Sequence, residues 1–280
     1  MEDLTDYYEN YYGHLLPDLT LVHNRLRNNG TEVMFFLAGD STLDNKHWLK
    51  DQRVPVARNY SGLMEKSVPD VCYWFNHLLQ GTNAGAINCA VEESTLGERR
   101  TSLLAHDIFI RDNLRIKDVL IISVGGNDIA LKPSAGTVVN MTSLILLPLS
   151  VIRWNPSYTY FVNLFREGFK SYIGQLTTKC QPRQVIISGT YYPCLHGSGW
   201  ADRILGLLGY NNNPLKLQTI IRMIFTDAIT NLGLPMDVRY APLYEVLDAN
   251  DPSDYVARVE PSSIGGKKMA KYYLKVYSQT

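Results

Sequence analysis

Three uninterrupted apolar runs, each followed by a glycine, constrain most strongly what this 280-residue chain can fold into. Apolar runs without polar alternation are typical of strands buried on both faces, and such strands belong to parallel sheets. The three runs span residues 33–38, 119–124 and 185–188, and weaker strand patterns lie at 86–89 and 238–243. Helical patterns separate them, at residues 2–28, 68–79, 97–114, 158–178, 200–209, 214–232 and 264–277. The alternation predicts an α/β fold with a central parallel sheet covered by helices on both faces.

The segments that follow the strands are the predicted place for a functional site. In an open parallel sheet, ligands bind outside the carboxyl ends of the strands. The residues that fall there and carry useful chemistry are Asp40, Ser41, Gly126, Asn127, Asp128, Tyr191 and His196. We therefore expect these side chains to lie near one another.

The domain organisation is predicted to be a single domain over residues 1–280, because no repeat or low-complexity linker divides the chain. Residues 1–30 are expected to form an N-terminal helical extension. Residues 130–156 are an insertion that contains a strongly apolar stretch, 141–154. This stretch is too short to span a bilayer, and Pro148 interrupts it. It is expected to be a buried cover, or a wall or lid beside a substrate site.

Charge and composition exclude several classes of function. The chain has 27 basic and 27 acidic side chains, so its net charge indicates neither nucleic-acid binding nor attraction to an anionic membrane. Its N-terminus has no basic segment followed by an apolar core, so no secretory signal is predicted. The four cysteines share no metal-binding spacing and are expected to be reduced thiols of a cytoplasmic protein. We expect a small-molecule substrate, no membrane span, no nucleic acid, no metal and no cofactor.

Two motifs in this order resemble those of the SGNH hydrolases, the GDSL-type esterases and lipases. Gly39-Asp40-Ser41 follows the first strand, and Gly125-Gly126-Asn127-Asp128 follows a later one. Weaker matches at Ile87-Asn88 and Pro261–Gly265 extend the resemblance over residues 33–276. It implies a three-layer αβα sandwich of flavodoxin type, with Ser41 as the nucleophile of an ester or acyl hydrolase. It further implies that the Ser41 N–H and the Asn127 side chain hold an oxyanion, and such donors are suited to that charge.

The sequence departs from the family in its last motif, Asp-x-x-His-Pro. Aligned on Pro261, the histidine position holds Glu260 and the aspartate position holds Ala257. Glu260 is one candidate base, although a free glutamate, with a reference pKa of about 4.3, is a weaker base than histidine. Burial or a like-charged neighbour would raise that pKa. His196, in a glycine-rich loop after a strand, is the other candidate, so the base stays open between the two.

A second departure puts Glu93 where the family has an oxyanion-hole glycine, five residues after Asn88. Asp40, Glu92, Glu93 and Glu260 then suggest an acidic pocket that would suit an amine-bearing substrate or a metal ion. Their spacing lacks a tight metal-ligand pattern, which does not favour the metal. Three functions remain open on these residues. One is a serine hydrolase with a non-standard base. The others are a lyase or transferase that uses Glu93 and Glu260, and an inactive binding protein that keeps the pocket.

Overall fold

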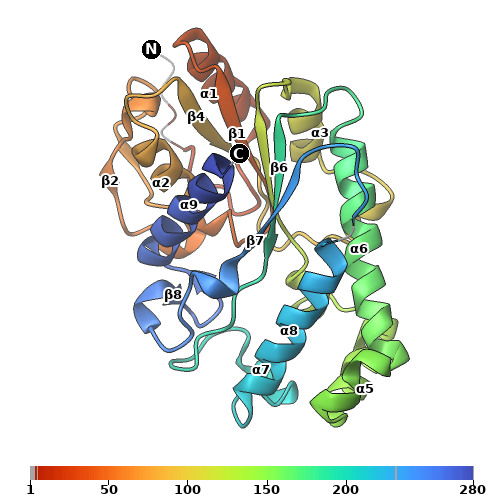
Figure 1. Cartoon of the computed structure of the whole chain (residues 1–280). Helices are drawn as coiled ribbons and strands as arrows, with labels where there is room; N and C mark the ends of the chain where they lie inside the picture. Colours follow the sequence, from red (N-terminus) through yellow and green to blue (C-terminus); the bar gives the residue numbers. More distant parts are fainter. Residues whose placement is uncertain (1–3, 5, 231, 280) are drawn as a thin grey trace.

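A five-stranded parallel sheet forms the centre of the molecule (Figure 1). The computed structural model describes residue 4, residues 6–230 and residues 232–279. Strands follow the order β4-β1-β5-β6-β7, which is the flavodoxin-type order. Their bounds are β1 (Val33–Gly39), β4 (Ala84–Asn88), β5 (Val119–Ser123), β6 (Gln184–Gly189) and β7 (Val238–Pro242). All five predicted strands are therefore confirmed, and the chain reverses its direction across the sheet between β1 and β5.

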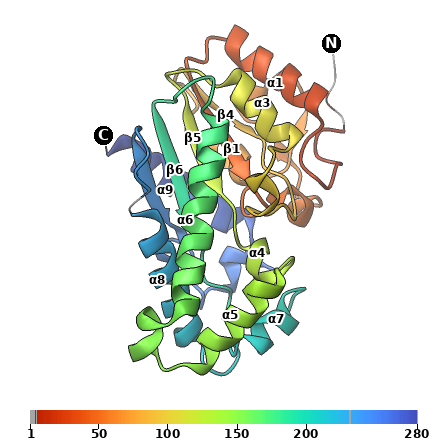
Figure 2. The same ribbon diagram turned by 90° about the vertical axis from the view of Figure 1, so that its right-hand side faces the viewer.

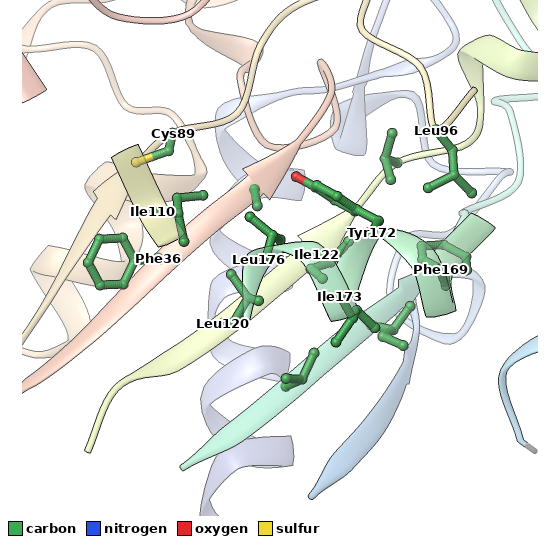
Figure 3. Close-up of a cluster of buried hydrophobic side chains, with 14 of the residues drawn as sticks. Phe36, Cys89, Leu96, Ile110, Leu120, Ile122, Phe169, Tyr172, Ile173 and Leu176 are labelled. Atoms are coloured by element: carbon green, nitrogen blue, oxygen red, sulfur yellow. The ribbon is translucent and has the colours of Figure 1, made fainter. Parts of the chain in front are cut away.

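Helices cover both faces of the sheet, which gives the predicted αβα sandwich (Figures 1 and 2). Side chains alternate along each strand, so Phe35 packs towards one helical layer and Phe36 towards the other. Figure 3 shows side chains on this second face, where Phe36 lies beside Ile110 and Leu120 lies beside Leu176. One layer consists of α2 (Val71–Leu78) and α9 (Ser263–Ser278), and the other of α1 (Leu16–Asn28), α3 (Ala105–Asn113), α6 (Pro156–Leu176) and α8 (Pro214–Ile229).

Two predicted helices differ from the structure. The N-terminal extension contains a helix only over Leu16–Asn28, and residues 6–9 form turns; residues 1–3 and 5 lie outside the described part of the chain. Pro17 does not break this helix but occupies its first turn, where the missing N–H would have no helical partner. The predicted helix at 97–114 is divided into a short 3₁₀ turn at Glu98–Arg100 and α3.

The insertion at 130–156 folds as α5 (Ala135–Leu146) followed by a 3₁₀ helix at Leu149–Trp154. Together with α7 (Asp202–Leu207) and the N-terminal half of α8, these helices extend beyond the carboxyl edge of the sheet (Figures 1 and 2). We call this group the helical cap. Within the described residues, no helix combines the length and apolarity that crossing a membrane requires.

Candidate functional site

Ser41 lies in a tight turn at the end of β1, and Gly39 makes that turn possible. Gly39 has a φ of 140°, and a Cβ atom on it would lie 1.7 Å from the carbonyl oxygen of Ser123. Only glycine fits both the torsion angle and the space. The N–H groups of Leu43 and Asp44 donate to the Asp40 carbonyl, each at 3.0 Å, which closes the turn around Ser41. Among the described residues, the Ser41 N–H has no acceptor, so it is free to bind an oxyanion.

A fully buried arginine holds the strand end in place, and the sequence patterns did not reveal it. Arg99 donates from Nη2 to the Gly39 carbonyl at 3.1 Å, and its Nε forms an ion pair with Asp107 at 2.9 Å. Ser94 Oγ donates to the same Gly39 carbonyl at 2.9 Å. Arg99 has no motif around it, and its role depends on segments that are distant in the sequence. These bonds fix the backbone next to the nucleophile.

Glu260, which the sequence alignment on Pro261 put at the histidine position, lies beside Ser41. It begins β9 (Glu260–Pro261), which pairs with β8 (Tyr255–Val256) in a short hairpin. Its Oε1 accepts a hydrogen bond from Trp200 Nε1 at 3.0 Å. Its Oε2 is buried and has no hydrogen-bond partner among the described residues. The Ser41 hydroxyl lies close enough to lower the pKa of the carboxyl group. Glu260 thus has an oxygen available to accept the proton of Ser41.

The environment of Glu260 gives it the proton affinity of a histidine. Burial, reinforced by the charge of Asp40, raises the pKa of Glu260 to about 7, against the opposing effects of Trp200 and the Ser41 hydroxyl. This value lies close to the ordinary pKa of a histidine, about 6.5. The low working pH expected of a free glutamate therefore does not follow for this buried one.

Two further acids lie close to this pair. Burial raises the pKa of Asp40 to about 6, although bonds from Thr42 and the charge of Arg99 oppose the shift. Burial and then the charge of Glu260 raise the pKa of Glu92 to about 9. Glu92 accepts only a long bond from Trp48 Nε1, at 3.4 Å, and its other oxygen has no partner among the described residues. At neutral pH, Glu92 is therefore protonated while Asp40 is largely ionised.

The hairpin that carries Glu260 is fixed by Arg258. This residue adopts a φ of 70°, and its guanidinium donates to the Cys194 carbonyl, to Asp202 and to Asn211 at 2.9–3.1 Å. The backbone of Cys194 donates in turn to the Arg258 carbonyl at 2.8 Å. The loop after β6 and the C-terminal hairpin are therefore tied together, so Trp200 and Glu260 keep their relative positions.

Asn127 is placed to complete the oxyanion site. It begins α4 (Asn127–Ala130) just after β5, and its Nδ2 donates to the Ser94 carbonyl at 3.0 Å. The amide carries two hydrogens, so one remains for a ligand. Gly126 lines the same cavity, and its N–H has no acceptor within the described residues. Asn127, Gly126 and Ser41 all line the cavity and thus offer three N–H donors to a ligand there.

Three residues that the sequence placed in the site are not brought into the cavity. Asp128 turns away and accepts from the N–H groups of Leu96 and Gly97, each at 2.7 Å, so it holds the backbone. Glu93 accepts from the Tyr11 hydroxyl at 3.1 Å. Its φ of 57° is consistent with glycine in the family at this position. His196 is exposed in its loop and does not line the cavity, which excludes it as the base in this conformation.

A cavity of about 180 Å³ opens from Ser41 into the helical cap. The polar groups at its inner end include Asp40, Ser41, Asn127 and Glu260, and Tyr191 lies beside them with its hydroxyl bonded to the Val259 carbonyl. The remainder of the lining is mostly apolar, and α5 contributes Met141, Leu144 and Ile145 to it. The other apolar residues that line the cavity come from α6, α7 and α8 and include Phe161, Phe165, Ile204, Leu205, Leu217, Ile220, Ile221, Ile224 and Phe225.

No metal site accompanies these acids. The described residues contain no group of three or more histidine, cysteine or acidic side chains that could hold a metal ion. The Glu260 carboxylate instead contacts the Ser41 hydroxyl and the Trp200 indole. Trp200 was missed by the sequence patterns because a tryptophan in a glycine-rich loop has no motif, and only the tertiary structure brings it to Glu260.

Replacing Glu92 with glutamine is expected to stabilise the protein increasingly as the pH rises from about 5 to about 9. The unfolded glutamate ionises near pH 4.5, whereas folding keeps Glu92 protonated up to about pH 9, so the native state loses stability over this interval. Glutamine carries no such proton, and the gain should reach the order of 2–4 kcal/mol. Denaturant unfolding at several pH values measures it, with Glu93→Gln at the neighbouring, partly exposed residue as control. If the difference in unfolding free energy between Glu92→Gln and the wild type does not change with pH, folding does not keep Glu92 protonated, and the prediction is wrong.

Comparison with solved structures supports the fold. A lipase from a goat rumen metagenome, Lip_vut3, is 14% identical and superposes with a TM-score of 0.53 over 87% of this chain and 97% of its own. A protein from Slackia heliotrinireducens classed as an SGNH hydrolase is 11% identical, with a TM-score of 0.49 over 88% and 98% of the two chains. The acetylxylan esterase Axe2 of Geobacillus stearothermophilus is 13% identical, with a TM-score of 0.46 over 88% and 94%.

Sequence comparison adds no closer relative. No protein-family model matches the chain. A search of curated proteins likewise gives no match. At these low identities, similarity to the solved structures is evidence for the fold alone. The strand order and the superposition with the lipase together show that the chain has a three-layer αβα fold of flavodoxin type.

Proposed function

We propose that this protein is a serine esterase in which Ser41 attacks the substrate and Glu260 replaces histidine as the base. The observation that carries the proposal is the placement of Ser41 and Glu260 at the polar end of one apolar cavity, where they act on each other. Free N–H donors of Ser41, Gly126 and Asn127 line the same cavity. Stability of the fold does not require a serine, a buried carboxylate and free N–H donors to line one cavity. Acyl transfer uses all of them, as nucleophile, base and oxyanion donors.

In the proposed reaction, Ser41 Oγ attacks the ester carbonyl while Glu260 Oε2 takes the hydroxyl proton. The carbonyl oxygen becomes negative and is held by the N–H donors of Ser41, Gly126 and Asn127. Glu260 then gives the proton to the departing alcohol, which leaves Ser41 acylated. A water molecule loses a proton to Glu260, attacks the acyl group and releases the acid. The proton returns to Ser41, so Glu260 is unchanged after one turnover.

One carboxylate can serve here without the aspartate of the family because its orientation has another source. In a serine–histidine pair, the aspartate orients the imidazole and stabilises its positive charge. Glu260 becomes neutral when protonated, so no counter-charge is needed. The Trp200 indole fixes one of its oxygens and leaves the other towards Ser41. A base is most effective when its pKa lies near the operating pH, which burial provides.

The proposed substrate is an ester with an apolar acyl or alkyl chain, because aliphatic and aromatic side chains form most of the cavity wall. The insertion contributes to this wall through α5, and we propose this role for residues 130–156. A serine–glutamate pair with an apolar cavity does not favour the lyase or transferase alternative based on Glu93 and Glu260, because Glu93 faces Tyr11 outside the cavity. A cytoplasmic location and a single domain stay predictions.

Hydrolysis of p-nitrophenyl esters from acetate to octanoate tests the function. The wild type should turn over these esters near neutral pH, and Ser41→Ala should lose the activity. Turnover that survives in Ser41→Ala but disappears in Glu260→Gln would instead support carboxylate chemistry without the serine. Absence of turnover, together with absence of labelling of Ser41 by a fluorophosphonate, would support an inactive binding protein.

Narrowing the cavity is expected to change the chain-length preference. Leu217→Trp introduces a larger side chain into the wall, so the ratio of kcat/KM for octanoate to that for acetate should fall about tenfold or more. Leu215→Trp, two residues earlier on α8, lies on the exposed side and should leave the ratio unchanged. Equal effects on both substrates would mean that the acyl chain does not occupy this space.

A further inference from the structure

The outer face of α5 carries no charged side chain, and its polar residues include only the exposed Thr142 and the half-exposed Asn140 and Ser143. Residues 133–152 contain no charged side chain, and they lie between Lys132 and Arg153. A contiguous surface of large exposed apolar side chains without charges is typical of a site that contacts a protein or a membrane. The inner side of α5 lines the cavity and packs on α6, so its outer side lacks a cover in the described structure. The exposed apolar residues of α5 and the following 3₁₀ helix are Val138, Val139, Leu146, Leu149, Val151 and Trp154.

Neighbouring helices continue this apolar surface. Leu207 on α7 and Leu215 on α8 are also exposed. The Lys216 ammonium donates to the Ile145 carbonyl, so the start of α8 lies against the end of α5. Figures 1 and 2 show α5, α7 and the N-terminal end of α8 gathered at one end of the molecule, beyond the sheet. Leu146 is 79% exposed and Trp154 is 89% exposed, which is unusual for side chains of this size in water.

The charge of the helical cap differs from that of the whole chain, which is neutral. Of the four charged side chains in the cap, Arg153, Arg203 and Lys216 are basic, and the acidic Asp202 is paired with Arg258. Lys132 and Arg153 form exposed ion pairs with Glu98 and Asp227, at 3.2 and 3.5 Å, and such pairs contribute little. Arg203 and Arg222 are exposed and form no ion pair with the described residues. The cap is therefore an apolar surface with a positive border.

We propose that the helical cap binds the surface of an anionic lipid membrane through the outer faces of α5, the 3₁₀ helix at Leu149–Trp154 and the start of α8. Apolar side chains would enter the boundary between headgroups and acyl chains, and the basic residues would contact anionic headgroups. Tryptophan next to arginine suits this boundary, where a ring is partly buried and a cation stays wet. A second copy of the chain is a poorer occupant, because two positive caps would repel each other. The binding does not depend on the proposed esterase activity, although it would deliver an apolar ester to the cavity.

Vesicle sedimentation with the full chain tests the proposal without any substrate. The wild type should bind vesicles of phosphatidylcholine mixed with phosphatidylglycerol, and bind vesicles of phosphatidylcholine alone more weakly. The double variant Leu146→Ser, Trp154→Ser should lower the partition coefficient about tenfold or more, because it removes two of the largest inserted groups. Ile116→Ser is the matched control, since Ile116 is 75% exposed but precedes β5 at the opposite edge of the sheet. Circular dichroism verifies that each variant is folded.

Further variants distinguish a lipid membrane from a second copy of the chain as the binding partner of this surface. Arg203→Gln should weaken binding to the anionic vesicles and leave binding to neutral vesicles unchanged, and salt should have the same effect. Failure of the wild type to bind anionic vesicles would overturn the proposal, as would equal losses in Ile116→Ser and the double variant. A concentration-dependent dimer that Leu146→Ser, Trp154→Ser abolishes would assign the surface to a second copy instead. If the chain binds vesicles but has no esterase activity, membrane binding is supported and only the proposed esterase function is contradicted.

Discussion

Replacing Glu260 with glutamine is expected to lower kcat/KM for p-nitrophenyl esters about a thousandfold, the middle of the range for loss of a general base. Glutamine has nearly the same shape and can still accept the hydrogen bond from Trp200. It cannot take a proton from Ser41, so attack on the ester loses its base. KM should change little, because Glu260 forms only the polar end of an apolar cavity. Steady-state kinetics on the folded variant measures both parameters.

The same variant should also remove the pH dependence of the reaction. The base must be ionised to work, so the wild-type rate should rise with pH and level off above the pKa of Glu260, about 7. Trp200→Phe is the control that keeps the carboxylate. The indole bond lowers the pKa of Glu260, so its loss should move the midpoint of the profile above that of the wild type. A Glu260→Gln enzyme within tenfold of the wild type would exclude Glu260 as the base.

Asn127→Ala is expected to lower kcat about 100- to 1000-fold with little change in KM. Removal of one oxyanion donor in other acyl-transfer enzymes has an effect of this size, because the donor acts mainly on the charged intermediate. The remaining N–H groups of Ser41 and Gly126 would hold the oxygen less well. Asn140→Ala, on α5 and outside the cavity lining, is the matched control and should leave kcat unchanged. A rise in KM with an unchanged kcat would mean that Asn127 contributes only to binding of the substrate in its ground state.

Sequence patterns located β1, β5 and β6 most clearly because these strands are buried on both faces, so nearly all their residues are apolar. The site followed from topology: the chain reverses direction between β1 and β5, and Ser41 and Asn127 come directly after these two strands. Glu260 followed from one aligned position. Each of these inferences needed only local pattern or order along the chain, and for that reason the sequence could support them.

Other parts of the site depend on contacts between distant segments. Asp128 follows Asn127 directly, yet it turns to the N–H groups of Leu96 and Gly97. Trp200 reaches Glu260 only because Arg258 ties the two loops together. The proton affinity of Glu260 likewise depends on burial, which no pattern in RVEPSS reveals. The helicity of α5 was not predicted, since its apolar residues lack the one-sided spacing by which a helix is recognised.

The charge distribution also escaped the sequence totals. A net charge of zero indicated no attraction to an anionic surface, yet three of the four charged residues in the helical cap, Arg153, Arg203 and Lys216, are basic. Acidic residues elsewhere cancel them in the sum. Totals therefore describe the solubility of a chain, whereas binding depends on which residues the fold brings to one face.

The most direct test of the Ser41–Glu260 pair is the rate at which a fluorophosphonate labels Ser41 as a function of pH, measured by mass spectrometry of the modified peptide. The wild type should be labelled at Ser41, with a rate that rises to a plateau around a midpoint near pH 7. Glu260→Gln should be labelled about a thousandfold more slowly at every pH above that midpoint. No label on Ser41, or the same rate in the wild type and Glu260→Gln, would contradict a serine nucleophile that is activated by this glutamate.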